Sequence, residues 1–156
     1  MNTHSTIRDN TSGEATTSDR VLQIALAARR QGNFVEVVDQ FDDQFTFNDH
    51  GLGLEFKDKG RLTEFLAKIR ELFQDSERSD NTIFSNGDHV ISERTLTATK
   101  TEPFLDGRLR KVPICERGIS VVLIKKGKIS QWSDYYDPLK ARRYAIAGWF
   151  TKWIEL

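Results

Sequence analysis

The most regular hydrophobic pattern in the chain lies between residues 59 and 73. Apolar side chains recur there at three- and four-residue spacing, with charged residues between them, at Leu62, Phe65, Leu66, Ile69, Leu72 and Phe73. This period matches one face of an α-helix, so the pattern predicts an amphipathic helix over 59–73.

Two further helices are expected near the N-terminus. Ser18 is a suitable N-cap for a helix that runs to about Arg30, and Gly32 suits its end. The apolar face of that helix consists of Val21, Ile24, Ala25 and Ala28. A short helix over about 34–40 follows. Residues 1–17 are rich in Thr, Ser, Asn and charge, which predicts a flexible tail.

Strand patterns account for most of the remaining chain. Polar and aromatic residues alternate over 44–48, and the glycines at 51 and 53 mark a bend. Later strands are predicted over 82–85, 89–101, 110–124 and 128–136, with reversals at Asp106–Gly107 and Lys126–Gly127. Consecutive strands joined by short turns predict an antiparallel meander.

This order of elements predicts an α+β fold in which a curved, mainly antiparallel sheet wraps around helices, a cone-shaped domain of the cystatin-like α+β barrel type. We expect one domain over 18–156, with an enclosed pocket on the concave face of the sheet. A C-terminal amphipathic helix would present Ile146, Trp149, Phe150 and Trp153 on one face. Such a stripe needs a partner surface, either the cone itself or a symmetric mate, so a homodimer is expected.

Charge and composition narrow the classes of partner. The 156 residues include 23 Lys and Arg and 23 Asp and Glu, so no net field favours nucleic acid, and no apolar run is long enough to span a membrane. Cys115 is the single cysteine and no apolar leader opens the sequence, which predicts a cytoplasmic protein. No spacing of His, Cys, Asp or Glu resembles a metal site, and no cofactor is expected.

The segment from Lys126 to Asp137, KGKISQWSDYYD, contains Trp, Asp, Tyr and a second Asp in a characteristic order. It resembles the last-strand motif of the nuclear-transport-factor-two-like superfamily, in its SnoaL-like and limonene epoxide hydrolase-like branch. Together with the strand around Ser92–Leu96, the resemblance covers roughly residues 18–142. It implies a cone-shaped domain with one small-molecule pocket.

In limonene epoxide hydrolases, an Asp–Arg–Asp group activates a water molecule that a Tyr and an Asn help to hold. The resemblance places Asp134 and Arg94 at the last-strand Asp and the bridging Arg, on adjacent strands, and Asn48 at the Asn. Leu96 stands where the family has its second Asp, and Thr46 stands where it has the Tyr. The family mechanism needs one carboxylate as base and another as acid, and Leu96 can be neither.

Alternation along the strands suggests a replacement for the missing carboxylate. If Arg94 and Asp134 point inward, then Leu96, Trp132 and Tyr136 do so as well. The same alternation brings Glu116 to the inner face of its strand. We therefore expect Asp134, Arg94 and Glu116 to form the catalytic cluster. A structural ion pair between Arg94 and Asp134 is the alternative.

The pocket walls are predicted from the same alternation. Thr46 and Asn48 would share the inner face of the first strand, and Leu96, Trp132 and Tyr136 would line the substrate site. His50 follows that strand and would reach the pocket mouth as an acid or base, unless it is a solvated loop residue.

Three functions fit these expectations. The leading one is acid/base isomerisation, cyclisation or water addition on a small apolar oxygenated molecule (a polyketide, terpenoid or steroid-like compound), with Asp134 as base positioned by Arg94. The alternatives are a limonene-type epoxide hydrolase and a non-catalytic ligand-binding or dimerisation module.

Overall fold

The computed structural model describes residues 17–73, 75–103 and 108–137. Helices and strands follow one another as α1 (Thr17–Gln31), α2 (Phe34–Asp39), β1 (Phe41–Asp49), β2 (Leu54–Phe56), α3 (Lys59–Leu72), β3 (Glu77–Asn86), β4 (His89–Pro103), β5 (Leu109–Lys125) and β6 (Lys128–Tyr136). The predicted flexible tail, the reversal at Asp106–Gly107 and the C-terminal helix with its apolar stripe lie outside the described residues, apart from Thr17.

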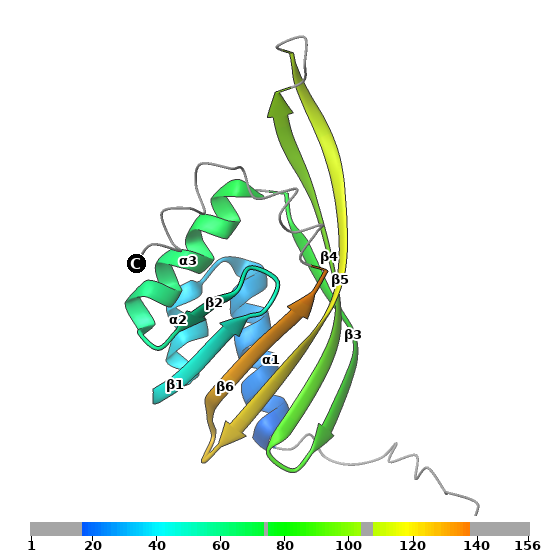
Figure 1. The fold of residues 1–156 in the computed structure, drawn as a ribbon. Helices are drawn as coiled ribbons and strands as arrows, with labels where there is room; N and C mark the ends of the chain where they lie inside the picture. The colour runs from blue at the N-terminus through cyan, green and yellow to red at the C-terminus, as the bar shows by residue number, and fades with distance from the viewer. Residues whose placement is uncertain (1–16, 74, 104–107, 138–156) are drawn as a thin grey trace, which may run out of the picture.

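The six strands form one curved sheet in the order β2-β1-β6-β5-β4-β3 (Figure 1). Strands β3 to β6 form the predicted antiparallel meander, whereas β1 pairs with β6 in parallel. The last described strand therefore lies inside the sheet, between β1 and β5. The sheet stays open, with β2 and β3 at its edges, and the helices pack on its concave side. The predicted α+β class with a wrapped antiparallel sheet is confirmed.

The helix boundaries follow the capping signals in the sequence. Helix α1 ends before Gly32, whose φ of 76° is a conformation that glycine adopts without strain. Asn33 caps α2 by accepting a hydrogen bond from the Glu36 N–H, and Asp58 caps α3 in the same way through Arg61. The prediction of a helix over 59–73 agrees with α3 to one residue.

The structure differs from the predicted strands at two places. Strand β3 begins at Glu77 rather than Thr82. The sequence pattern did not reveal this start, because the inward residues Arg78 and Asp80 are charged and give no apolar alternation. Strand β2 was not predicted, since its three residues are too few to show a period. A register shift between Asp80 and Thr82 also changes which residues of β3 face inward.

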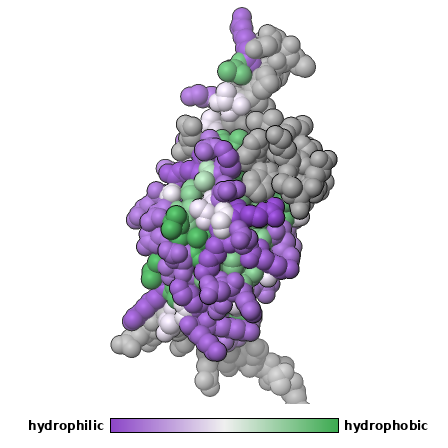
Figure 2. Space-filling model, turned by 90° about the vertical axis from the view of Figure 1, so that its left-hand side faces the viewer, coloured by the Kyte–Doolittle hydropathy of each residue, from purple (hydrophilic) through white to green (hydrophobic). Residues whose placement is uncertain are grey.

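The core is an aromatic cluster between α3 and the sheet. The Trp132 ring stacks against both Phe41 and Phe47, with ring centroids 6.1 and 6.3 Å away, and the Phe56 and Phe65 rings are 4.7 Å apart. Leu22, Leu26, Leu62 and Val90 complete it with almost no exposure. In the view of Figure 2, which faces α2, α3 and the β1–β2 edge, most described residues are hydrophilic, and the hydrophobic ones lie in small groups. On this face, most apolar side chains are thus covered.

No helix in the described part of the chain is both long and apolar enough to cross a bilayer.

Candidate active site

A cavity of about 270 Å³ lies between the helices and the concave face of the sheet. One part of its wall is apolar, formed chiefly by α3 and the adjoining strands, and the other part is charged. The residues that line it are Arg29, Arg30, Phe34, Asp49, Leu52, Phe65, Leu66, Ile69, Arg70, Phe73, Ser76, Glu77, Arg78, Arg94, Leu96, Ala98, Ile114, Glu116, Asp134 and Tyr136.

Arg94 connects two carboxylates at the charged end. Its Nη1 donates to Glu116 Oε1 at 3.0 Å, and its Nε lies 3.9 Å from Asp134 Oδ1. All three side chains are at least nine-tenths buried. The structure thus brings together Asp134, Arg94 and Glu116, the three residues expected to form the catalytic cluster.

Arg94 and Asp134 are on β4 and β6, so their expected placement on adjacent strands is corrected: β5 lies between them. They meet because β5 presents small residues at this level. Gly118 pairs with Arg94 on one side and Tyr136 on the other, and Ser120 pairs with Asp134. A Cβ on Gly118 would lie 3.2 Å from Arg94 Cζ and 2.6 Å from the Tyr135 carbonyl oxygen. The absence of a side chain at Gly118 lets the guanidinium reach across the strand.

Asp134 is held in its ionised form. Burial opposes its charge, but the guanidinium groups of Arg94, Arg29 and Arg78 outweigh burial and lower its pKa to about 2. Oδ1 also accepts hydrogen bonds from Ser120 Oγ at 2.5 Å and Trp132 Nε1 at 2.8 Å. A carboxylate so well stabilised is a weak proton acceptor, which argues against Asp134 as the base.

Glu116 has the opposite tendency. Burial raises its pKa, and the ion pair with Arg94 only partly offsets that effect. In the register of β4 and β5, Glu116 lies directly opposite Leu96. The carboxylate that Leu96 does not supply is therefore present one strand away, on the same face.

Asp49 is a site residue that the sequence analysis missed. Its side chain lies on the inner face of β1, pairs across the strands with Asp134, and accepts a hydrogen bond from the Tyr136 hydroxyl at 2.5 Å. Burial raises the pKa of Asp49, although the hydrogen bonds from Tyr136 and from the Leu52 N–H act against that rise. The site thus contains a third carboxylate.

The expected inward placement of Thr46 and Asn48 is corrected by the same alternation. Phe45, Phe47 and Asp49 occupy the buried face of β1, so Thr46 and Asn48 face the other side, where the Asn48 amide lies 3.4 Å from Ser133 Oγ. The spacing Phe45-x-Phe47-x-Asp49 was the signal that identifies the inner face, because large aromatic side chains are buried more readily than Thr or Asn.

The other predicted pocket residues divide into two groups. Leu96 and Tyr136 line the cavity, and the Tyr136 ring lies 5.2 Å from Arg94 Cζ. Trp132 is not a lining residue, because it is buried behind the cavity wall and donates to Asp134. His50 is exposed and stacks on Tyr135 with ring centroids 4.2 Å apart, away from the pocket.

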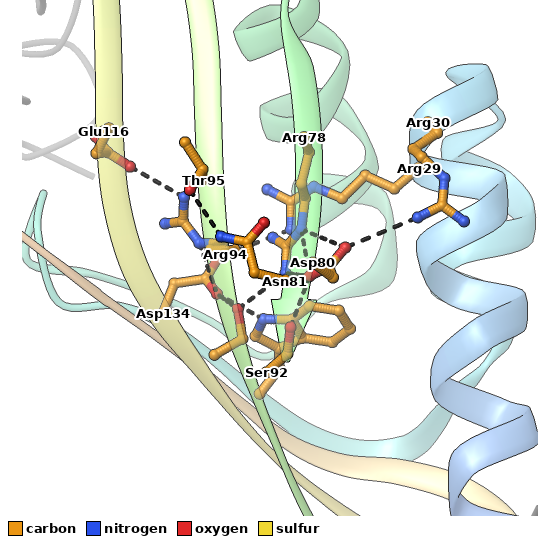
Figure 3. A network of polar contacts seen from close by, with 12 residues as sticks. Arg29, Arg30, Arg78, Asp80, Asn81, Ser92, Arg94, Thr95, Glu116 and Asp134 are labelled. Carbon is orange, nitrogen blue, oxygen red and sulfur yellow. Dashed lines mark hydrogen bonds and ion pairs between the residues drawn. The ribbon is translucent and has the colours of Figure 1, made fainter. Parts of the chain in front are cut away.

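A second charged group adjoins this cluster and was also missed from the sequence. Arg78 forms hydrogen bonds of 2.8 to 3.3 Å with the Asp80 carboxylate and donates to Ser120 Oγ at 3.1 Å. From α1, Arg29 reaches to 3.7 Å from Asp134, and Arg30 reaches to 3.7 Å from Asp80. Figure 3 shows these side chains converging from a helix and several strands on one polar cluster.

Within residues 17–73, 75–103 and 108–137, no three His, Cys, Asp or Glu side chains are grouped so as to hold a metal ion.

The open curved sheet, its helical cover and the concave pocket define a protein with the nuclear-transport-factor-two and ketosteroid isomerase-like fold. A model of the SnoaL-like domain matches residues 22–132, and the chain belongs to this family. A comparison with curated proteins gave no match.

Three solved structures illustrate the likeness. A protein assigned as a SnoaL-like polyketide cyclase from Shewanella putrefaciens has a TM-score of 0.69 and 9% identity, with 86% of this chain and 88% of that chain covered. An LEH-like epoxide hydrolase from M. tuberculosis gives 0.64 and 19%, with 92% and 100% covered. A ketosteroid isomerase-like protein from Catenulispora acidiphila, in complex with trimethylamine, gives 0.65 and 16%, with 75% and 85% covered. At these identities the likeness establishes the fold alone.

Proposed function

We propose that this chain is an enzyme that transfers protons on a small oxygenated molecule bound in the pocket. The observation behind the proposal is that three carboxylates around one cavity differ in protonation tendency. The pKa of Asp134 is lowered to about 2, whereas the pKa values of Glu116 and Asp49 are raised. A carboxyl group whose pKa is raised toward neutrality can gain and lose a proton near neutral pH, whereas one whose pKa is lowered stays ionised and serves as a counter-charge.

In this proposal Glu116 and Asp49 exchange protons with the substrate, and Asp134 holds Arg94 and Arg29 in place. The reaction is isomerisation or cyclisation: one carboxylate removes a proton from carbon next to a carbonyl, and the other, protonated, donates to oxygen. The apolar wall from α3, with Phe65, Leu66 and Ile69, supports an apolar substrate body such as a polyketide, terpenoid or steroid-like skeleton.

Epoxide hydrolysis is the second candidate, and the cross-strand pairing of Leu96 with Glu116 favours it. Protonated Glu116 would donate to the epoxide oxygen while Asp49 accepts a proton from the attacking water. The structural likeness to the M. tuberculosis LEH-like epoxide hydrolase supports this candidate. Identification of the reaction product distinguishes isomerisation or cyclisation from epoxide hydrolysis.

Enones, ketones and epoxides should first be screened for thermal stabilisation of the protein, and those that bind should be assayed for turnover. Glu116→Gln and Asp49→Asn should each lower kcat about 10² to 10⁴-fold, the usual contribution of a positioned acid or base. Glu77→Gln is the matched control, since Glu77 lines the same cavity but is exposed. Unchanged turnover in the double variant would refute the proposal, and binding without turnover would leave a ligand-binding module.

We also propose that the chain forms a homodimer through the face of the sheet opposite the helices. Large apolar side chains are exposed there: Phe84 (63%), Ile91 (41%), Ile119 (46%) and Tyr135 (46%). Phe84 pairs with Ile91 and Ile119 pairs with Tyr135 across neighbouring strands. Ile91 also pairs with Val121, two residues along β5 from Ile119, so the two pairs adjoin and form one patch. A second copy would cover the same residues on both molecules.

A further inference from the structure

Two buried N–H donors at the charged end of the pocket have no acceptor among the described residues. They are Arg78 Nη1 and Arg94 Nε, on side chains that are only 7% and 5% exposed. Arg94 Nε is 3.9 Å from the nearest Asp134 oxygen, which is too far for a hydrogen bond. A buried donor without an acceptor costs free energy, and both guanidinium groups belong to the cavity wall.

Positive charge is also crowded at this end. Arg29 and Arg78 both lie against the Trp132 ring, with Cζ atoms 6.0 and 5.9 Å from its centroid. Burial lowers the pKa of Arg29 to about 10, and the neighbouring Arg78 is the next largest cause. Arg94 also lowers the pKa of Arg29, and the charges of Asp134 and Asp49 only partly offset burial and these two cations. Added negative charge at this point would relieve the repulsion.

The carboxylates nearest to these two N–H donors are already hydrogen-bonded to other groups. Asp80 is already engaged by Arg78 through Nε and Nη2, and Asp134 accepts from Ser120 and Trp132. Glu116 accepts from Arg94 Nη1. A water molecule could accept from the unpaired donors, but it brings no charge.

From the unpaired donors and the crowded cations together, we infer that the pocket binds its ligand through a negatively charged oxygen group, a carboxylate or an ionised acidic enol, placed against Arg78 and Arg94. The rest of the ligand lies against the apolar wall. A cavity of about 270 Å³ is slightly smaller than typical ligand sites, which measure about 300–1,000 Å³, so a compact bicyclic body is a suitable size. This inference rests on the proposed small-molecule function, whose substrate class it narrows to acids.

The test compares ligand pairs that differ only in the acidic group, on the full chain by calorimetry. Naphthoate is paired with naphthamide, and hydroxynaphthoquinone, an acidic enol, is paired with its methyl ether. We expect at least one acid to bind about tenfold or more tightly than its neutral partner, because charge-assisted hydrogen bonds are stronger than neutral ones. Comparison of the two pairs shows which acid group is preferred. Equal affinity within both pairs, or no binding by either acid, would overturn the inference.

A variant then assigns the interaction to Arg78. Arg78→Lys keeps the positive charge beside Asp80 but removes the forked N–H groups. It should lower the affinity for the acid about tenfold and leave that for the neutral partner unchanged. Arg70→Lys is the control, because Arg70 lines the cavity and donates from Nη1 to the Arg30 carbonyl instead. An equal loss in both variants would contradict the role of Arg78.

Should Arg78→Lys fail to fold, the ligand pairs on the unaltered protein still decide the inference. Binding is measured here without turnover. Acids that bind and are never converted would leave this inference standing and refute the catalytic proposal, whereas turnover of neutral compounds alone would do the reverse.

Discussion

Asp134 and Asp49 are cross-strand neighbours on one face of the sheet, yet their surroundings shift their pKa values in opposite directions. Asp134 contacts or lies near three guanidinium groups, while Asp49 is hydrogen-bonded mainly by neutral donors. The two residues should therefore make opposite contributions to the pH dependence of stability.

For Asp134, the folded-state pKa of about 2 is below the ordinary value of 3.8 for an aspartate carboxyl group. Its charge therefore stabilises the fold above that value, and this contribution is lost as the pH falls toward 2. The difference corresponds to roughly 2 kcal/mol at about 1.36 kcal/mol per pKa unit. Asp134→Asn should cost about 3–5 kcal/mol at neutral pH, because three arginines lose a counter-charge. Denaturant unfolding should show that this cost shrinks between about pH 5 and pH 3. A cost that does not depend on pH would contradict the assignment.

For Asp49, the pH dependence of its contribution to stability has the opposite sign. Its folded-state pKa is raised, so ionisation of Asp49 as the pH rises destabilises the fold. Asn at this position retains an Oδ1 that can accept from Tyr136 and from the Leu52 N–H. The stability of Asp49→Asn relative to the unaltered protein should therefore increase as the pH rises from acid to neutral. Unfolding experiments over that range measure the trend. No trend would show that Asp49 ionises without penalty, and a decrease would show that its ionisation stabilises the fold; either result would contradict the raised pKa.

Three residues of the charged cluster could be predicted from the sequence, and three could not. Arg94, Glu116 and Asp134 could be placed from alternation and from the last-strand motif. Asp49, Arg29 and Arg78 could not, because charged residues near strand or helix ends are usually solvated. Only the tertiary packing of α1 on the sheet and the pairing of the strands show that these three side chains face the cavity.

Strand β5 determines whether residues on its two neighbours can meet. Gly118 leaves room for the Arg94 guanidinium and lies close to Tyr136 Cβ. Gly118→Ala should destabilise the protein by about 1–3 kcal/mol, because the new methyl group would be 2.6 Å from a carbonyl oxygen that cannot move independently of the sheet. Thermal or denaturant unfolding measures the loss.

The same substitution at Gly60 is the control. Gly60 is in the first turn of α3, and an added Cβ would meet only Asp58 Oδ1, at 3.2 Å. Alanine favours helix more than glycine does, so Gly60→Ala should be neutral or mildly stabilising. Equal losses at the two positions would show that contact at Gly118 is not what matters.

The elements were predicted well where apolar periodicity is regular. Helices α1 and α3 and strands β4 to β6 show clear periods and clear stops, and their boundaries agree to within a few residues. The start of β3 could not be found, because inward Arg78 and Asp80 invert the usual pattern and the register then shifts after Asp80. Strand pairing beyond the meander, in particular the parallel pairing of β1 with β6, is a long-range contact for which the sequence has no local signal.

At the scale of the whole molecule, the proposed dimer gives a direct test. Ile119→Lys places a charge in the exposed apolar patch of the sheet, and it should convert a dimer into a monomer in sedimentation experiments at micromolar concentration. Ile24→Lys is a matched control, since Ile24 is similarly exposed (44%) but lies on α1. A monomeric unaltered protein, or dissociation by both substitutions, would contradict the proposed interface.

The position of β6 between β1 and β5 affects when the binding site can form during protein synthesis. Until residues 128–136 leave the ribosome, the nascent chain lacks the one strand that pairs with both β1 and β5, so β1 and β2 cannot be joined to β3, β4 and β5 in one sheet of this order. Asp49 is on β1, and Arg94 and Glu116 are on β4 and β5. Only docking of β6 joins these strands, and it brings Asp134 and Tyr136 with it. A ligand that requires all five groups therefore cannot bind a partly translated chain, and it selectively stabilises the finished fold.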